Sequence, residues 1–144
     1  GDVYKRQGER TVADSMRADN PAMTSPQIAY DYMAPRLVRL PHEEFWVMYL
    51  NQAHHVISER RIGQGGVSGT YVDVRLVIKG ALEELASAMI LFHNHPSGNL
   101  RPSPQDENIT RKIRDAASIF DIRLNDHIII TSGAYFSFHD EGKI

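Results

Sequence analysis

The segment that decides the fold runs from Ala88 to Asp106 and reads AMILFHNHPSGNLRPSPQD. Its first part, Ala88–His93, has the length and the dense apolar character of a buried strand. Its last part, from Ser103, is a helix start, with serine as the N-cap and proline at the first helical position. The prolines and the glycine between these parts supply the bends of an ordered loop. The segment therefore predicts a strand, a stiff loop and a helix in direct succession.

Apolar periodicity extends this unit in both directions along the chain. A helix is expected from Ser25, and Pro35 should kink or end it. The glycines between positions 63 and 69 are expected to form bends or bulges. The predicted class is α/β (α+β), with a single mixed sheet flanked by helices. The expected elements are a helix from 25, strands 45–50 and 54–60, a helix 73–86, a strand 88–93, a helix 103–120, and strands 127–131 and 135–138.

Length, charge and cysteine content limit the possible functions. The chain has 144 residues, a net charge of -2 and no cysteine. The chain has no excess of positive charge with which to bind the phosphate backbone of a nucleic acid. Without cysteine, thiolate nucleophiles and cysteine-ligated zinc sites are excluded, and a reducing cytoplasm is the expected compartment. The longest apolar run, 88–92, is far short of the roughly 18–20 residues of a membrane span, so no membrane partner is expected.

The first residues of the chain look foreign to the rest. Residues 1–7 read GDVYKRQ, and positions 2–7 resemble the translated end of a transposase sequencing adapter. We expect a scar over 1–7, a loose polar lead-in over 8–24 and one domain over 25–144. This hypothesis leaves open whether the natural protein begins further upstream and whether an N-terminal domain is missing. The alternative is a disordered N-terminal tail.

The spacing of two histidines and an aspartate indicates a metal site. His93 and His95 lie two apart at the end of a predicted strand, so both imidazoles point to the same side. The turning loop can bring Asp106 back beside them. Two histidines, one carboxylate and a water are the ligands of a catalytic zinc site. The competing interpretation is that Ser103 and Asp106 only cap the helix, and the two roles partly exclude each other.

HNHPSG followed by PSPQD resembles the metal-binding signature of the JAMM, or MPN-type, metalloproteases, in which HxH and a spacer precede SxxD. The resemblance is closest to the RadC-like branch. It continues through HEEFWVMYLN, TYVDVR, DHIII and YFSFHDEG and covers about residues 25–142. It implies a mixed sheet flanked by helices, close to the fold of cytidine deaminases. Deaminase chemistry itself is excluded, because those zinc sites need cysteine ligands.

The resemblance also assigns roles to residues of the signature. It makes His93, His95 and Asp106 the ligands of one Zn²⁺ per chain. Ser103 matches the serine of the family, which hydrogen-bonds the metal-activated water or the tetrahedral oxyanion.

The family also has a catalytic glutamate at the start of an upstream strand. Glu43 and Glu44 both stand there, and strand alternation lets only one of them face the metal. The RadC-like pattern favours Glu43 as the general base and leaves Glu44 as the alternative; the other acid would be a solvated residue at a strand edge. Arg75 matches a family arginine that could anchor an acidic group of a substrate, although a surface or capping arginine fits equally well.

The function that these residues predict is a zinc-dependent metallohydrolase, a peptidase or isopeptidase that cleaves amide bonds of a peptide or protein substrate. One alternative is a DNA-repair or recombination accessory protein, the historical description of RadC-like proteins, although the sequence supports a nucleic-acid partner only weakly. A non-catalytic interaction module is the other alternative. The physiological substrate and the oligomeric state stay open at this stage.

Overall fold

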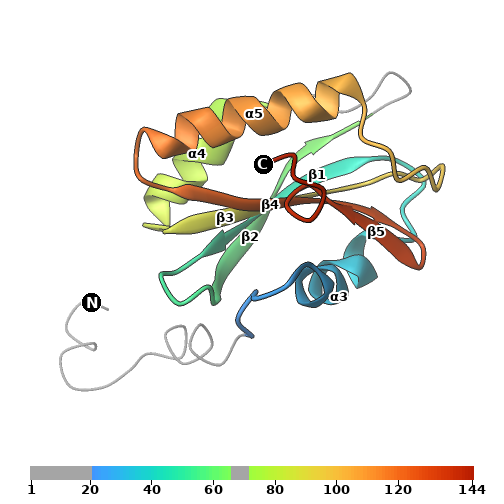
Figure 1. Ribbon diagram of the computed structural model, residues 1–144, viewed down its shortest axis with the longest axis horizontal. Helices are drawn as coiled ribbons and strands as arrows, with labels where there is room; N and C mark the ends of the chain where they lie inside the picture. Colours follow the sequence, from blue (N-terminus) through green and yellow to red (C-terminus); the bar gives the residue numbers. More distant parts are fainter. Residues whose placement is uncertain (1–20, 66–71) are drawn as a thin grey trace.

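A five-stranded sheet lies between one helix on one face and two on the other (Figure 1). The computed structural model describes residues 21–65 and 72–144. The strand order is β2–β1–β3–β4–β5; β3 and β4 run parallel, and the other neighbouring pairs run antiparallel. This confirms the predicted mixed sheet flanked by helices. The elements are α3 (Pro26–Leu37), β1 (Glu44–Leu50), β2 (Val56–Gln64), α4 (Val74–Glu83), β3 (Ala88–Asn94), α5 (Pro104–Ser118), β4 (Arg123–Thr131) and β5 (Ala134–Ser137).

The core has two halves, one on each face of the sheet. All seven residues of the central strand β3 are buried, as its continuous apolar run predicts. Successive side chains of a strand point to opposite faces, so Met48 and Phe92 pack on the α3 side while Val47 and Leu91 pack on the side of α4 and α5. The same alternation decides which polar side chains at the strand ends share a face.

The parallel pair β3–β4 requires a crossover connection, and α5 supplies it. The chain leaves the end of β3, passes through the proline-rich loop and enters α5, which packs back against β4. Ser103 is the N-cap and Pro104 opens the helix, as the sequence predicts. This connection returns the first turn of α5 to the neighbourhood of the histidines that end β3.

Close packing holds α4 against the sheet. The Tyr49 hydroxyl donates a hydrogen bond to the Val77 carbonyl at 2.8 Å. A Cβ atom at Gly80 would collide with the same hydroxyl oxygen. Glycine is therefore required at this position for α4 to approach β1.

Three local features differ from or refine the expectations. The helix α3 continues through Pro35 to Leu37, so the expectation that Pro35 ends the helix is wrong; Ala34 and Leu37 are buried in the core, and this packing outweighs the one backbone bond that proline removes. At the end of the expected lead-in, Met23 is buried and its N–H donates to the His54 carbonyl. The pairing of β1 with β2 shifts register next to Gly63, which is a bulge of the expected kind.

Several expectations concern residues outside the described ranges. The adapter scar over 1–7, most of the lead-in over 8–24, and the bends expected at Gly66 and Gly69 belong to this group. Among the helices of the described residues, none has the length and apolar character needed to cross a bilayer.

Candidate metal centre

Two imidazoles converge where β3 ends. His93 is the sixth residue of β3 and is only 2% exposed; His95 follows the strand directly. Their Nε2 atoms lie 2.8 Å apart, on the same side of the strand as the alternation predicts. The Nδ1 atom of His95 contacts the Asn99 carbonyl oxygen at 2.6 Å. Since a carbonyl only accepts, that Nδ1 carries the proton, and a neutral His95 directs the lone pair of Nε2 toward His93.

Asp106 brings a carboxylate to the same point from the first turn of α5. Its Oδ1 lies 3.3 Å from His93 Nε2, and its Oδ2 lies 3.5 Å from His95 Nε2. The same side chain accepts the Ser103 N–H at 2.8 Å, while the Asp106 N–H donates to Ser103 Oγ at 3.1 Å. Asp106 therefore both caps the helix and faces the two histidines, because two carboxylate oxygens offer about four lone pairs.

Glu43 and Glu44 lie on opposite faces of the sheet. Phe45 pairs with His93 across β1 and β3, so Phe45 and Glu43, two residues apart, lie on the face of His93. A carboxylate oxygen of Glu43 and ligand nitrogens of His93 and His95 all lie within 4.8 Å of one another. A Glu/His/His group of this kind could bind a metal ion.

Glu44 belongs to a separate cluster on the α3 face. It contacts His42 Nε2 at 2.8 Å, accepts the Trp46 indole N–H at 3.0 Å and lies 3.6 Å from the Arg61 guanidinium. Burial raises the pKa of Glu44, but the hydrogen bonds from His42 and Trp46 and the charge of Arg61 outweigh it, so the pKa lies below its ordinary value. Glu44 is 7% exposed, so the expectation of a solvated acid at a strand edge is wrong for this residue.

Asn94 separates the two clusters and holds the backbone on both sides of Glu43. Its Oδ1 accepts the Glu44 N–H at 2.8 Å, and its Nδ2 donates to the His42 carbonyl at 2.9 Å. From the other side, the Gly65 N–H donates to the Glu43 carbonyl at 2.7 Å. Three hydrogen bonds therefore fix the segment that carries the Glu43 side chain.

The electrostatics of the converging groups favour a cation among them. Burial raises the pKa of Asp106, but the neighbouring imidazoles of His93 and His95 outweigh it and hold the pKa far below its ordinary value. Burial lowers the pKa of His95, but Asp106 and the Asn99 carbonyl reverse this and leave it raised. A site that favours a proton on an imidazole beside a carboxylate also favours a divalent cation there.

Two of the three distances among these ligand atoms fit a small tetrahedral ion. Ligands about 2.0–2.2 Å from a tetrahedral zinc are about 3.3–3.6 Å apart. The contacts of Asp106 with the two imidazoles, 3.3 and 3.5 Å, have this length. The Nε2 pair at 2.8 Å is shorter by about half an ångström than that tetrahedral edge. Imidazole and carboxylate donors are also the types that zinc prefers in sites without cysteine.

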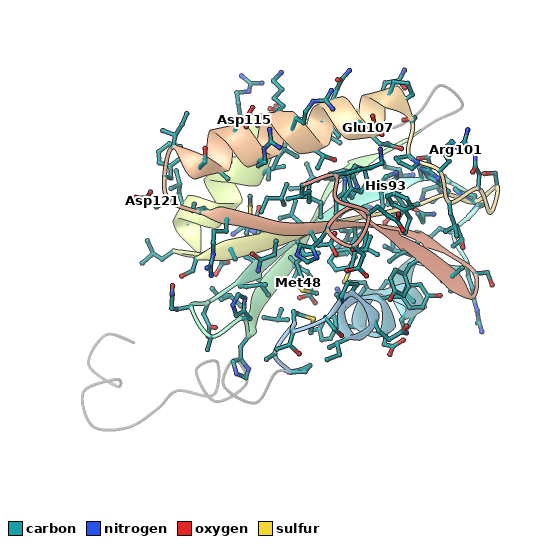
Figure 2. All side chains as sticks on the ribbon, in the orientation of Figure 1. Met48, His93, Arg101, Glu107, Asp115 and Asp121 are labelled. Carbon is teal, nitrogen blue, oxygen red and sulfur yellow. The ribbon has the colours of Figure 1, made fainter. Side chains whose placement is uncertain are left out.

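A groove of about 1070 Å³ opens over the converging groups. Figure 2 shows His93 between the sheet and α5, with Arg101 on the loop that leads into that helix. Phe45, Val72 and Ile109 contribute apolar wall, and Lys112 adds a cation. A groove with apolar walls and a few convergent polar groups is the usual form of a ligand site.

Arg75, like Glu44, is an expected site residue that the structure does not bring to this groove. It lies at the start of α4, its side chain is largely exposed, and its guanidinium pairs with Asp73 at 2.9 Å. Asp73 is the N-cap of α4, so Arg75 forms this ion pair with the residue that caps the helix.

Three residues of the site were missed or undervalued by the sequence reasoning. Of these, His127 is fully buried and contacts His93 Nδ1 at 2.8 Å. Burial, and then the neighbouring His93, lower the pKa of His127 well below its ordinary value. Thr110 and Asn94 were not singled out. The available signals were the position of Asn94 between the two histidines and that of Thr110, one helical turn after Asp106.

Comparisons with known proteins identify the family of this chain. A model of the RadC-like JAB domain family matches residues 23–143, and the chain belongs to that family. A UPF0758 protein of Flavobacterium johnsoniae is 52% identical over 120 residues, covering 83% of this chain and 52% of the relative. A UPF0758 protein of Porphyromonas gingivalis is 51% identical over 124 residues, covering 85% of this chain and 55% of the relative.

A shorter relative is matched over most of its length. The UPF0758 protein YfjY of Escherichia coli is 39% identical over 129 residues, covering 90% of this chain and 81% of the relative. The chain thus spans about half the length of the Flavobacterium and Porphyromonas relatives. Membership of the family suggests a JAMM-type metallohydrolase or a role related to DNA repair.

Proposed function

We propose that the chain is a zinc-dependent hydrolase of amide bonds, with a peptide or an isopeptide as its substrate. The observation that carries the proposal is the convergence of two imidazole nitrogens and two carboxylates in the wall of one groove. When bound, zinc supplies a Lewis acid and lowers the pKa of a bound water from 15.7 to about 7. One ion per chain would be held by His93, His95 and Asp106.

Glu43 is the general base in this proposal. Its carboxylate lies within 4.8 Å of the histidine ligand nitrogens, whereas Asp106 comes within 3.3 and 3.5 Å of them. The close contacts of Asp106 with both imidazoles suit a ligand, and Glu43 lies near enough to the same point to act on a water beside the ligand set. Glu43 takes a proton from that water and delivers it to the leaving amine.

Ser103 is proposed to donate a hydrogen bond to the developing oxyanion. As the N-cap, it uses an oxygen lone pair to accept the Asp106 N–H at 3.1 Å. Capping therefore leaves the hydroxyl proton free to donate. Ser103 also lines the groove, so that proton can point toward a substrate carbonyl.

The decisive experiment compares the two adjacent glutamates as a matched pair. Zinc-loaded protein is screened against fluorogenic peptides and isopeptide-linked substrates, and then Glu43→Gln and Glu44→Gln are assayed on any substrate that is cleaved. Loss of a general base lowers kcat by about 10²–10⁴-fold, so Glu43→Gln should do so with zinc still bound. Folded Glu44→Gln should keep most of the activity. Equal losses in the two variants would contradict the assignment of the base.

Two alternatives remain as outcomes of further assays. A net charge of -2 gives the chain no general attraction for DNA. Salt-dependent binding of single- or double-stranded DNA by the folded protein would favour the repair-related role. An interaction module without catalysis would bind a protein partner equally well in Glu43→Gln.

A further inference from the structure

A buried chain of hydrogen bonds connects the first turns of α5 to His93. His93 Nδ1 lies 2.8 Å from His127 Nε2, and His127 Nδ1 lies 2.6 Å from Thr110 Oγ1. The Thr110 hydroxyl in turn lies 2.6 Å from the carbonyl oxygen of Asp106, one helical turn earlier. The chain therefore begins on the backbone of one candidate ligand, Asp106, and ends on the ring of another, His93.

The direction of each proton follows from counting donors and acceptors. The Asp106 carbonyl can only accept, so the single hydroxyl proton of Thr110 is directed to it. Toward His127, the Thr110 oxygen must then accept, which places the proton of His127 on Nδ1. The other nitrogen of a neutral His127 carries a lone pair, and it accepts the Nδ1 proton of His93.

The surroundings of His127 favour the neutral ring that this count requires. The side chain is 0% exposed. Its ring stacks on Phe138 at a centroid distance of 4.5 Å and meets Phe45 edge-on at 5.6 Å. Both ring nitrogens contact a neutral hydroxyl or imidazole partner. A charged imidazolium in such an apolar slot would carry a large desolvation penalty.

We infer that Thr110 and His127 are positioning residues that hold His93 in the tautomer protonated at Nδ1, with the lone pair of Nε2 directed at His95 and Asp106. The inference rests on the proposed metal site, because that lone pair is the one a metal would use. Outer partners of this kind fix the tautomer and the ring orientation of a ligating histidine. Here the partner is a second histidine whose own tautomer is set by a threonine on α5.

The contrasting explanation is that His127 and Thr110 only fill space. Under that explanation, Thr110→Val, which keeps the shape of the side chain and removes the hydroxyl, would leave the protons of His93 where they are. Thr110→Ser keeps the hydroxyl and loses a methyl group, so it is the matched control. Packing alone predicts that the serine variant is at least as disturbed as the valine variant, whereas the relay predicts the reverse.

The test reads the tautomer directly in metal-free protein. Two-bond proton–nitrogen NMR spectra of ¹⁵N-histidine-labelled protein distinguish Nδ1-protonated from Nε2-protonated rings, and the His93 signal is identified by its loss in His93→Gln. The spectra are recorded at about pH 8.5, well above the ordinary histidine pKa of about 6.5. The wild type and Thr110→Ser should show His93 protonated at Nδ1. In Thr110→Val, His127 can donate from Nε2, and His93 should shift toward protonation at Nε2.

Zinc affinity provides a second readout, measured by competition with a chromophoric chelator. Loss of an outer-shell partner typically costs 10–100-fold in metal affinity, and we expect that loss in Thr110→Val but not in Thr110→Ser. If Thr110→Val fails to fold, His127→Phe serves instead, since it keeps an aromatic ring between Phe45 and Phe138 and removes the acceptor for His93.

The outcomes separate this inference from the proposed function. An unchanged His93 tautomer in folded Thr110→Val and His127→Phe, with zinc affinity within about twofold of the wild type, would overturn the inference. Because the tautomer is measured without metal, the expected shift in Thr110→Val would support the relay even if wild-type protein bound no zinc. A wild-type protein that bound no zinc would overturn only the proposed metal site.

Discussion

Two clusters of acids and histidines lie on opposite faces of the sheet, where β1 begins and β3 ends. On the α3 face, Glu44 is surrounded by donors: an imidazole, an indole N–H and a guanidinium. On the α5 face, the Nε2 atoms of His93 and His95 face each other at 2.8 Å, beside the carboxylates of Asp106 and Glu43. The residue types in the two clusters are similar. In the Glu44 cluster, hydrogen-bond donors surround the acceptor oxygens of the carboxylate. In the cluster on the α5 face, acceptor nitrogens and acceptor oxygens converge on one another.

The difference teaches which feature identifies a cation site. A buried acid whose oxygens are matched by donors is a structural element, and its burial is compensated within the protein. Several lone pairs directed at one point repel one another unless a proton or a metal lies between them. The geometry therefore gives the Glu44 cluster a structural role and makes the other cluster the one that could bind a cation, although Glu43 and Glu44 are neighbours in sequence.

The largest expected effect is on metal binding, and it comes from the charge of Asp106. Asp106→Asn keeps a side-chain oxygen that can accept the Ser103 N–H, so the cap of α5 persists while the negative charge is lost. Because losing an outer-shell partner already costs 10–100-fold, losing the charge of a direct ligand should lower zinc affinity by more than about 100-fold. Competition with a chelator measures this.

The matched control for that variant is Glu107→Gln. Glu107 is the next acid in the first turn of α5, and its carboxylate pairs with Lys143 at 2.9 Å, outside the converging groups. The Glu107→Gln variant should bind zinc with the affinity of the wild type. Equal zinc affinities in Asp106→Asn and Glu107→Gln would remove Asp106 from the ligand set.

The next effect concerns Asn94, which separates the clusters. Asn94→Ala leaves the Glu44 N–H and the His42 carbonyl without their partner, and we expect a loss of about 2–3 kcal/mol in the free energy of unfolding. Glu43 should lose its fixed position, so activity should fall by about 10–100-fold with zinc content unchanged. Asn125→Ala, which removes a half-buried contact with His54, should have little effect on activity. Zinc loss in Asn94→Ala would show instead that Asn94 supports the ligands.

The smallest effect is on acid stability, and it tests the structural role of Glu44. Its pKa is lowered by folding, so its ionised form stabilises the protein above the ordinary glutamate pKa of about 4.3 and this stabilisation is lost as pH falls through the lowered value. Glu44→Gln should therefore be less stable than wild type by about 1–2 kcal/mol at neutral pH, and the difference should shrink toward pH 3. Urea denaturation at both pH values measures it. A difference that grows on acidification would contradict the assigned direction.

Sequence reasoning recovered the elements that rest on local signals. Ser103 followed by proline set the start of α5, and the apolar run from Ala88 set β3. It failed at Pro35, because whether a helix continues through a proline near its end depends on tertiary burial of the residues that follow. Local rules carry no information on that burial.

The site was only partly within reach for the same reason. The alternation of side chains along a strand predicts that Glu43 and Glu44 face opposite sides of the sheet. Which of the two faces His93 depends on the pairing of Phe45 with His93 across β1 and β3. The contact of His127 with His93 depends on the register of β3 against β4, which shifts between Met89 and Ile90. The register between two strands that are distant in sequence cannot be predicted from the sequence of either strand alone.

The central claim is that the acceptors converging at the end of β3 hold a metal ion. Its most direct test is the metal content of purified wild-type protein and of the double variant His93→Ala/His95→Ala, measured by elemental mass spectrometry without added metal. We predict about one zinc per wild-type chain and almost none in a folded double variant, with circular dichroism as the check on folding. A well-folded wild type that holds no zinc, even after zinc has been supplied, would contradict the account.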